Sequence, residues 1–234
     1  MIEAPRDGEK RAAAEAAVAE IEAGMLVGLG TGTTAAFAIA ALGERARAGL
    51  RIKCVATSFA TARAAEAVGL AILDMADQAS VDLCIDGVDE IDPDLRAIKG
   101  GGGAMVREKI VAAAASRMIA IADSSKAVTR LGSRAVPIEV LEFGWRFVAA
   151  EVGRLGAIVT ARQSGSTFYR SDQGNPVLDC SFAELGDPAA LSAVLDALPG
   201  MVGHGLFIGE IDALYLGTAA GVRKSGRTPS VGDI

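Results

Sequence analysis

The chain of 234 residues has one histidine, three cysteines and only 4% aromatic residues, and these shortages exclude several kinds of site. Because His204 is the only histidine, a histidine metal cluster or a His-based catalytic triad lacks members. Cys54, Cys84 and Cys180 are far apart and form no CxxC pair, which predicts reduced thiols rather than a disulfide framework or a zinc site. We expect His204 on a loop or at a subunit contact.

Long apolar runs and runs of basic residues are also missing. No apolar run approaches the roughly 18 residues that a bilayer-spanning helix needs, and the N-terminus lacks the apolar core of a signal peptide. The formal net charge of -6 argues against a nucleic-acid or membrane-surface partner. We therefore expect a cytoplasmic protein with neither partner, in which a local pocket of N–H groups and lysines could still bind phosphate.

The first half of the chain alternates strand-like and helix-like segments, which predicts a parallel sheet with helices on both faces. The expected helices cover 8–23, 31–49, 59–69 and 104–116. The expected strands are MLVGLG, RIKCVATS, AILDM, VDLCID and MIAIADSS.

The pattern of strand-like and helix-like segments changes near residue 131, and the second half suggests a β-α-β-β-α-β order. The expected fold class is therefore α/β: a Rossmann-like parallel sheet with helices on both faces, plus a smaller inserted α+β, ferredoxin-like domain. Residues 1–130 and 207–234 would form the first domain, and residues 131–206 the second, which we expect at a subunit interface.

Polar residues follow four of the expected strands, where an open parallel sheet binds its ligands. They are Thr31, Gly32, Thr33 and Thr34; Thr57, Ser58 and Thr61; Asp86 and Asp89; and Asp123, Ser124, Ser125 and Lys126. Polar residues at several strand ends indicate a ligand site more specifically than polar residues at any single strand end.

The stretch GLGTGTT is neither of the two common phosphate loops. Thr33 stands where GxGxxG has its third glycine, and no lysine follows the last glycine as in a Walker loop. A loosened turn with hydroxyls at a helix N-terminus would suit a small phosphate or sugar oxygens. The alternative is a tight turn in which Thr33 or Thr34 caps the helix.

The stretch DGVDEIDPD packs five carboxylates into nine residues, but it lacks the spacing of a calcium loop. For Glu90, Asp92 and Asp94 we favour a solvated acidic turn. Asp86 and Asp89 lie directly at a strand end, where they could accept hydrogen bonds from sugar hydroxyls or assist proton transfer.

The stretch KGGGGAMVREK places four glycines between a lysine and a carboxylate. Glu108 would abstract a proton next to a carbonyl, while Lys99 and the glycine N–H groups hold the resulting oxyanion. The alternative is that Glu108 only complements the helix dipole, with Arg107 and Lys109 as solvated neighbours.

Together these motifs resemble ribose-5-phosphate isomerase of the A type, in order and through nearly the whole chain. The resemblance rests on GTGTT, TSFAT, DGVDEID, KGGGGAMVREK, DSSK, SDQGNPVLD and PGMVGHGLF. It implies an aldose–ketose isomerase of the pentose phosphate pathway that interconverts ribose 5-phosphate and ribulose 5-phosphate through an enediolate, without metal or nucleotide cofactor.

The resemblance also implies the roles of individual residues. Glu108 would be the base, Lys99 would stabilise the enediolate, and Asp86 would assist opening of the furanose ring. It further implies a homodimer or homotetramer. The expected substrate-binding residues are Lys10, Thr31, Gly32, Thr33, Thr34, Asp86, Gly87, Val88, Asp89, Lys99, Gly100, Gly101, Gly102 and Lys126.

The chain departs from the usual family pattern at four places. Thr33 replaces serine, Val88 replaces alanine and Gln173 replaces asparagine, and His204 stands where asparagine is frequent; none of these changes threatens the proposed chemistry. Two other functions remain open at this point: a non-catalytic sugar-phosphate sensor, and an acyl-transfer enzyme with a glutamate nucleophile.

Overall fold

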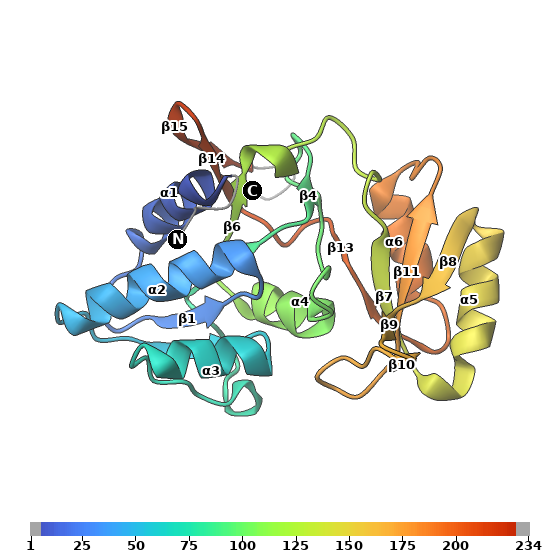
Figure 1. Cartoon of the computed structure of the whole chain (residues 1–234), viewed down its shortest axis with the longest axis horizontal. Helices are drawn as coiled ribbons and strands as arrows, with labels where there is room; N and C mark the ends of the chain where they lie inside the picture. Colours follow the sequence, from blue (N-terminus) through green and yellow to red (C-terminus); the bar gives the residue numbers. More distant parts are fainter. Residues whose placement is uncertain (1–5, 228–234) are drawn as a thin grey trace, which may run out of the picture.

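The computed structural model describes residues 6–227. The ends of the predicted first domain, residues 1–5 and 228–234, lie outside the described residues. A six-stranded sheet and a four-stranded sheet lie side by side in Figure 1, and the strands β4 (Glu90–Ile91) and β13 (Leu206–Phe207) of a small three-stranded sheet are drawn between them.

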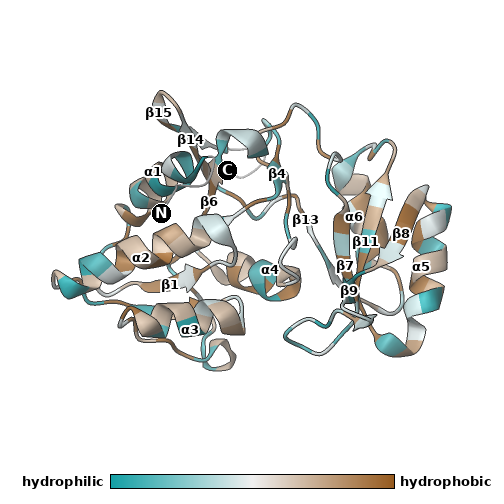
Figure 2. Cartoon of the chain, viewed as in Figure 1, coloured by the Kyte–Doolittle hydropathy of each residue, from teal (hydrophilic) through white to brown (hydrophobic). Residues whose placement is uncertain are grey.

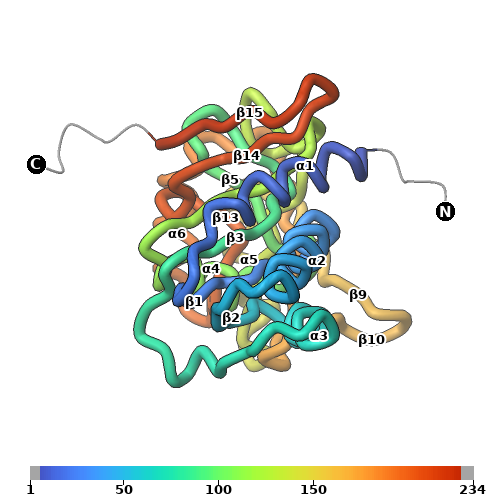
Figure 3. The backbone as a smooth tube through the Cα atoms, turned by 90° about the vertical axis from the view of Figure 1, so that its left-hand side faces the viewer, coloured from blue at the N-terminus to red at the C-terminus, as the bar shows by residue number. Residues whose placement is uncertain are grey.

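The six-stranded sheet has the order β15-β14-β6-β3-β1-β2, and every neighbouring pair is parallel except β14 with β15. Its strands are β1 (Leu26–Leu29), β2 (Lys53–Ala56), β3 (Leu83–Gly87), β6 (Met118–Asp123), β14 (Ala213–Thr218) and β15 (Gly221–Gly226). The C-terminal segment therefore returns to the first sheet, as expected. Figure 3 shows β14 and β15 beside α1 (Asp7–Val18), from the opposite end of the chain.

Helices cover both faces of this sheet, which confirms the predicted α/β arrangement. Ala17 of α1, Leu42 of α2 (Thr33–Arg47) and Ala65 of α3 (Phe59–Ala67) belong to the core on one face. Val111 of α4 (Met105–Ala114) belongs to the core on the other face. In Figure 2 hydrophobic colour follows the strands, while hydrophilic bands mark α1, α2 and α5.

The predicted strand AILDM is wrong. Only Ile72 pairs with the sheet, through a single bridge to Cys54, and a 3-10 helix follows at Met75–Asp77. The Asp74 carboxylate accepts a hydrogen bond from the Ala76 N–H at 3.0 Å. This local bond favours the turn over a longer ladder.

The four-stranded sheet has the order β12-β7-β11-β8 with antiparallel neighbours, the ferredoxin-like arrangement expected from the sequence. It lies between β6 and β14 in the chain; the predicted boundaries at residues 131 and 206 stay a prediction. Its elements are β7 (Val136–Val140), α5 (Trp145–Arg154), β8 (Ala157–Ala161), β11 (Val177–Phe182), α6 (Pro188–Asp196) and β12 (Met201–His204).

Shorter elements connect the two larger sheets. The three-stranded sheet pairs β4 (Glu90–Ile91) with β5 (Ala97–Ile98), and β5 with β13 (Leu206–Phe207). A two-stranded ribbon joins β9 (Gln163–Ser164) to β10 (Thr167–Phe168), and 3-10 helices cover Ser124–Lys126 and Glu142–Gly144. Within residues 6–227, no helix is both long enough and apolar enough to cross a membrane.

The expected loop or subunit position of His204 is wrong. His204 lies on β12, is 1% exposed, and its Nε2 lies 3.0 Å from Asp196 Oδ1. Burial, followed by the nearby Lys109 charge, lowers the pKa of His204 to about 4, so the imidazole is neutral at physiological pH.

Candidate active site

The strands β1, β3 and β6 end at the same edge of the parallel sheet, and their loops meet the glycine run there. They enclose a small cavity of about 90 Å³. The cavity is lined by Thr31, Gly32, Thr33, Thr34, Gly87, Val88, Asp89, Lys99, Gly100, Gly101, Gly102, Glu108 and Lys126. All thirteen belong to the set predicted from the sequence; the other two predicted residues, Asp86 and Lys10, do not line it.

A buried cluster of three charges forms the floor of this site. The Lys99 ammonium lies 2.8 Å from Asp86 Oδ2 and 3.4 Å from Glu108 Oε2, and it also donates to the Gly87 carbonyl. None of the three side chains is more than 4% exposed. Asp86 Oδ1 accepts hydrogen bonds from the N–H groups of Thr31 and Gly87, at 3.0 Å and 2.7 Å.

The two carboxylates share one ammonium, so one carboxyl group is left without full compensation. Asp86 Oδ1 has two N–H donors, whereas within residues 6–227 Glu108 Oε2, like Asp86 Oδ2, accepts no hydrogen bond and meets only the charge of Lys99. Burial raises the pKa of Glu108 to about 8, against the attraction of Lys99 and with the repulsion of Asp86. Glu108 can therefore gain and lose a proton near neutral pH.

The other two members of the cluster keep their charges. Burial alone would lower the pKa of Lys99, but the Asp86 and Glu108 carboxylates outweigh it and raise the pKa above its ordinary value. Burial raises the pKa of Asp86, and the adjacent Lys99 opposes that shift. We favour the ionised form of Asp86, because Lys99 and two N–H groups all stabilise its negative charge.

The alternative that Glu108 only complements the helix dipole is wrong, although its expected place in the first turn is confirmed. Glu108 lies in the first turn of α4, but it is 3% exposed and faces Lys99. Its neighbours are not merely solvated either. Arg107 Nε donates to Gln173 Oε1 at 2.6 Å, and Lys109 Nζ donates to the Leu206 carbonyl at 2.7 Å.

The four glycines of the run are required for different reasons. Gly100 and Gly103 have φ angles of 95° and 78°, in the left-handed region that favours glycine. A Cβ at Gly101 would lie 2.9 Å from Asp89 Oδ1. A Cβ at Gly102 would meet only Thr31 Cγ2, at 3.6 Å, so the missing side chain there leaves room in the cavity instead of relieving a clash.

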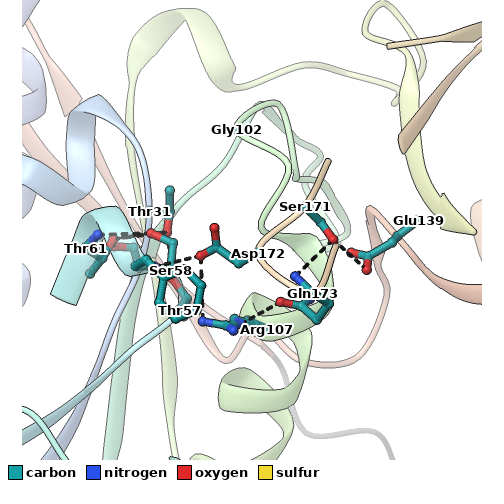
Figure 4. Close-up of polar contacts among 12 residues, drawn as sticks. Thr31, Thr57, Ser58, Thr61, Gly102, Arg107, Glu139, Ser171, Asp172 and Gln173 are labelled. Atoms are coloured by element: carbon teal, nitrogen blue, oxygen red, sulfur yellow. Dashed lines mark hydrogen bonds and ion pairs between the residues drawn. The ribbon is translucent and has the colours of Figure 1, made fainter. Parts of the chain in front are cut away.

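The GTGTT turn opens the N-terminus of α2 toward the cavity. The N-cap is Gly32, with φ of 113° and no side-chain capping bond, so the expected alternative of Thr33 or Thr34 as N-cap is wrong. Uncapped N–H groups at a helix N-terminus favour an anion. The Thr31 hydroxyl contacts those of Thr57, Ser58 and Thr61 at 2.8, 2.9 and 3.1 Å, as Figure 4 shows.

Lysine side chains reach this end of the sheet from two elements. Lys126 lies on the 3-10 helix Ser124–Lys126 and lines the cavity, while Lys10 lies on α1 and pairs with Asp7 at 3.3 Å. Glu9 ties the two elements together, since its Oε2 accepts from both the N–H and the hydroxyl of Ser124. Nothing in the sequence distinguished Glu9 from other charges of an alanine-rich helix.

The solvated acidic turn is wrong for two of its three members. Glu90 and Asp92 are 2% and 3% exposed, whereas Asp94 is exposed as predicted. Glu90 accepts hydrogen bonds from the Gly132 N–H, at 2.8 Å, and from the Ser133 hydroxyl; Asp92 accepts from Arg96 Nε at 2.7 Å. The partners of Glu90 come from a turn that the sequence pattern does not bring near it, whereas Arg96, the partner of Asp92, lies in the same turn.

The segment between β10 and β11 crosses from the four-stranded sheet to the edge of the site (Figure 4). Asp172 Oδ2 accepts from the Phe59 N–H at 2.7 Å and lies 3.7 Å from Arg107 Nη1. The buried Glu139 carboxylate of β7 accepts from the Ser171 hydroxyl at 2.8 Å and anchors this segment. Sequence reasoning missed these contacts, although SDQGNPVLD belongs to the recognised motifs.

Metal ligands do not gather at this edge in the part of the chain that the structure describes. Within residues 6–227, no group of three or more His, Cys, Asp and Glu side chains is arranged to hold a metal ion. The chemistry that the described residues offer is the proton exchange of Glu108 beside Lys99 and the exposed N–H groups of two glycine-containing loops.

The fold and the site define an α/β enzyme of acid–base type, with a buried carboxyl group, an ammonium and a helix N-terminus without a side-chain cap around a small cavity. The sequence model for "Ribose 5-phosphate isomerase A (phosphoriboisomerase A)" matches residues 53–221. The chain belongs to this family of isomerases.

Individual relatives agree with this assignment. A ribose-5-phosphate isomerase A from Sphingopyxis alaskensis is 49% identical over 208 residues, which cover 89% of this chain and 91% of the relative. The solved ribose 5-phosphate isomerase A from Methanocaldococcus jannaschii has a TM-score of 0.90 at 32% identity, covering 95% of this chain and 100% of that one. A D-ribose-5-phosphate isomerase solved in complex with phospho-erythronic acid has a TM-score of 0.91 at 33% identity, covering 94% and 99%.

Proposed function

We propose that Glu108 is the base with which this isomerase interconverts ribose 5-phosphate and ribulose 5-phosphate. In the aldose-to-ketose direction the Glu108 carboxylate removes the proton from C2 of the open-chain sugar and returns a proton to C1, while the hydroxyl proton of O2 passes to O1 at the enediolate. The observation that carries this proposal is the pairing of Glu108 Oε2 with Lys99 at 3.4 Å, at the wall of the cavity. Because the pKa of Glu108 is about 8, the group can act in both directions near neutral pH.

Lys99 and the glycine run would stabilise the enediolate that forms between these two proton transfers. A buried ammonium and preorganised N–H groups interact more strongly with a developing oxyanion than water would. Asp86 touches Lys99 and does not line the cavity, which supports a role in holding the ammonium. Its assistance of ring opening, implied by the resemblance, stays a prediction.

The phosphate and hydroxyl groups of the substrate would occupy the remainder of the lining. The uncapped N-terminus of α2 and Lys126 supply N–H groups and positive charge for the phosphate, with Lys10 nearby on α1. Asp89 would bind sugar hydroxyls, and its Oδ2 already accepts from the Gly101 N–H at 2.8 Å. The sensor and acyl-transfer alternatives are set aside because the matched family is an isomerase.

The decisive experiment follows ketose formation from ribose 5-phosphate in the presence of EDTA. Wild type should turn over with chelator present, since the proposed steps use only side chains and N–H groups. Glu108→Gln should lose about 10²- to 10⁴-fold in kcat, the usual contribution of a general base. The matched control is Asp94→Asn, which changes an exposed carboxylate and should leave kcat unchanged.

Three results would contradict the proposal. An inactive wild type would exclude the reaction, and full activity of Glu108→Gln would exclude the role of Glu108. Loss of activity with EDTA, restored by a divalent cation, would show that a metal ion takes part.

We further propose that the chain works in the cytoplasm as a homodimer or homotetramer. Support for self-association comes from three large apolar side chains of neighbouring elements, Phe143, Phe147 and Ile158, which are at least half exposed. Burying such side chains against a second copy would remove apolar surface from water. Light scattering of wild type and Ile158→Lys tests this, and a monomeric wild type would contradict it.

A further inference from the structure

The outer side of the glycine run is held by two side chains from the region of the four-stranded sheet. Arg162, directly after β8, donates from Nη1 to the carbonyl oxygens of Gly100 and Gly101, at 3.2 Å and 3.1 Å. The Tyr169 hydroxyl donates to the carbonyl oxygen of Gly102 at 2.9 Å. Three successive carbonyl groups of the run thus point toward side-chain donors on this outer side.

Arg162 is itself held in one orientation. Its Nε and Nη2 donate to the two carboxylate oxygens of Asp179 on β11, at 2.9 Å and 2.5 Å. The guanidinium also lies over the Tyr169 ring, 5.5 Å from its centroid. The two hydrogen bonds to the Asp179 carboxylate and the contact with the Tyr169 ring leave the planar guanidinium little rotational freedom. Nη1 therefore presents its N–H groups in a defined direction.

The direction of these carbonyl groups determines the direction of the N–H groups that follow them. The peptide bonds of the described chain are trans, and in a trans peptide the C=O and N–H bonds point to opposite sides. The N–H groups of Gly101 and Gly102 therefore point away from Arg162. The Gly101 N–H donates to Asp89, a residue of the cavity.

The N–H of Gly102 is the group left for a ligand. It meets no acceptor within residues 6–227, and Gly102 lines the cavity, with only Thr31 in contact range of an added Cβ. Figure 4 shows Gly102 on the turn above the hydroxyl cluster of Thr31, Thr57, Ser58 and Thr61.

We infer that Arg162, held by Asp179, is a positioning residue that aims the Gly102 N–H at the enediolate oxyanion. Arg162 does not line the cavity; it acts through the peptide groups between Gly100 and Gly102. Its positive charge also polarises these peptides, which makes their N–H groups stronger donors to an anion. This inference rests on the proposed isomerisation, because only that reaction develops the oxyanion.

The expected consequence is a selective loss of turnover. An oxyanion exists in the transition state and not in the bound sugar, so misdirecting its donor lowers kcat and leaves KM largely unchanged. For Arg162→Met we expect kcat to fall about 10- to 100-fold. This fall should not exceed the fall in kcat caused by removing a donor that contacts the oxyanion directly. Tyr169→Phe, which keeps the ring and removes one hydroxyl, should lower kcat several-fold. The matched control is Arg154→Met, an exposed arginine of α5, which should leave kcat unchanged.

Ligand binding separates this role from a general effect on the site. Phospho-erythronic acid presents a carboxylate together with a phosphate, whereas inorganic phosphate tests the phosphate subsite alone. Calorimetry with each ligand should show that Arg162→Met weakens phospho-erythronic acid about tenfold or more and changes phosphate affinity less than about twofold.

Each remaining outcome decides between the proposals. The inference is overturned if folded Arg162→Met keeps its kcat, or if it loses affinity equally for both ligands. The proposed function still stands in either case, provided that wild type isomerises ribose 5-phosphate. An inactive wild type overturns the proposed function first. If Arg162→Met does not fold, Asp179→Asn decides, because it removes the carboxylate charge that orients Arg162, and an unaltered kcat in that variant overturns the inference.

Discussion

The buried Glu108 carboxyl should make the stability of the folded chain fall as pH rises. Its pKa is about 8 in the folded state and near 4.5 in an unfolded chain, and burial is the main cause of the difference. Between these two values the folded state holds a proton that the unfolded state has released. Stability from this group is therefore complete below pH 4.5 and is lost as pH rises through about 8.

The size of this effect follows from the two pKa values. Each pH unit between them is equivalent to about 1.4 kcal/mol, so ionising Glu108 costs the folded state roughly 5 kcal/mol. The attraction of Lys99 at 3.4 Å is already included in that folded-state pKa. Because typical domains are stable by only about 5–15 kcal/mol, this is a large share of the total.

Glu108→Gln replaces the ionisable group with a neutral group of the same shape. Urea unfolding followed by circular dichroism at pH 5, 7 and 9 measures the difference in free energy between variant and wild type. At pH 5 the two should be similar, and by pH 9 the variant should be more stable by an amount approaching roughly 5 kcal/mol. Glu66→Gln, at an exposed position of α3, is the control whose difference should not change with pH.

The reasoning fails if the wild-type and Glu108→Gln stability curves run parallel between pH 5 and pH 9. That result would mean that Glu108 is already ionised at pH 5, and that burial does not raise its pKa. If Glu108→Gln instead became more stable than wild type as pH falls, the sign of the predicted difference would be reversed. That result would be equally incompatible with the buried geometry.

Three further predictions concern catalysis and the glycine run. The value of kcat/KM should rise with pH along a limb whose midpoint lies near pH 8, because Glu108 must be ionised to accept a proton. A midpoint below pH 6 would contradict the raised pKa of Glu108. Lys99→Met should lower kcat by about 10²- to 10³-fold and lower the unfolding midpoint, because two buried carboxyl groups lose their ammonium; an unchanged midpoint would argue against the buried cluster. Gly102→Ala should keep its free energy of unfolding within about 1 kcal/mol of wild type and raise KM. Gly103→Ala should lose about 1–3 kcal/mol of unfolding free energy, because Gly103 has a positive φ angle and an added Cβ would meet Tyr169. Equal losses in the two variants would contradict this distinction.

The main outline of the fold and site could be predicted from the sequence because its signals are local. Alternation of apolar strands with helices predicts the parallel sheet, and parallel strands place their carboxyl ends at one edge. Thr31, Asp89 and Lys126 therefore come together at the cavity although they are far apart in the chain. The run KGGGG likewise indicated a close approach to the backbone, since glycine at such density is costly without a reason.

Several features could not be predicted because they depend on partners distant in sequence. Glu90 looks like a member of a solvated acidic turn, yet the Gly132 N–H and the Ser133 hydroxyl, from a turn distant in the chain, satisfy its carboxylate. The position of His204 on β12 depends on the pairing of a strand with β7, which no local pattern shows. In each case burial was decided by the packing of other segments over the residue.

By itself the sequence determined which chemical groups this isomerase has available and the order in which they follow the strands. Only the tertiary structure decided their charge states and directions. Burial, opposed by Lys99 and assisted by Asp86, raises the pKa of Glu108 into the range where it can exchange a proton, because a low-dielectric surrounding disfavours the charged form. The donors of Arg162 turn the glycine carbonyls outward, and a trans peptide then turns the following N–H inward.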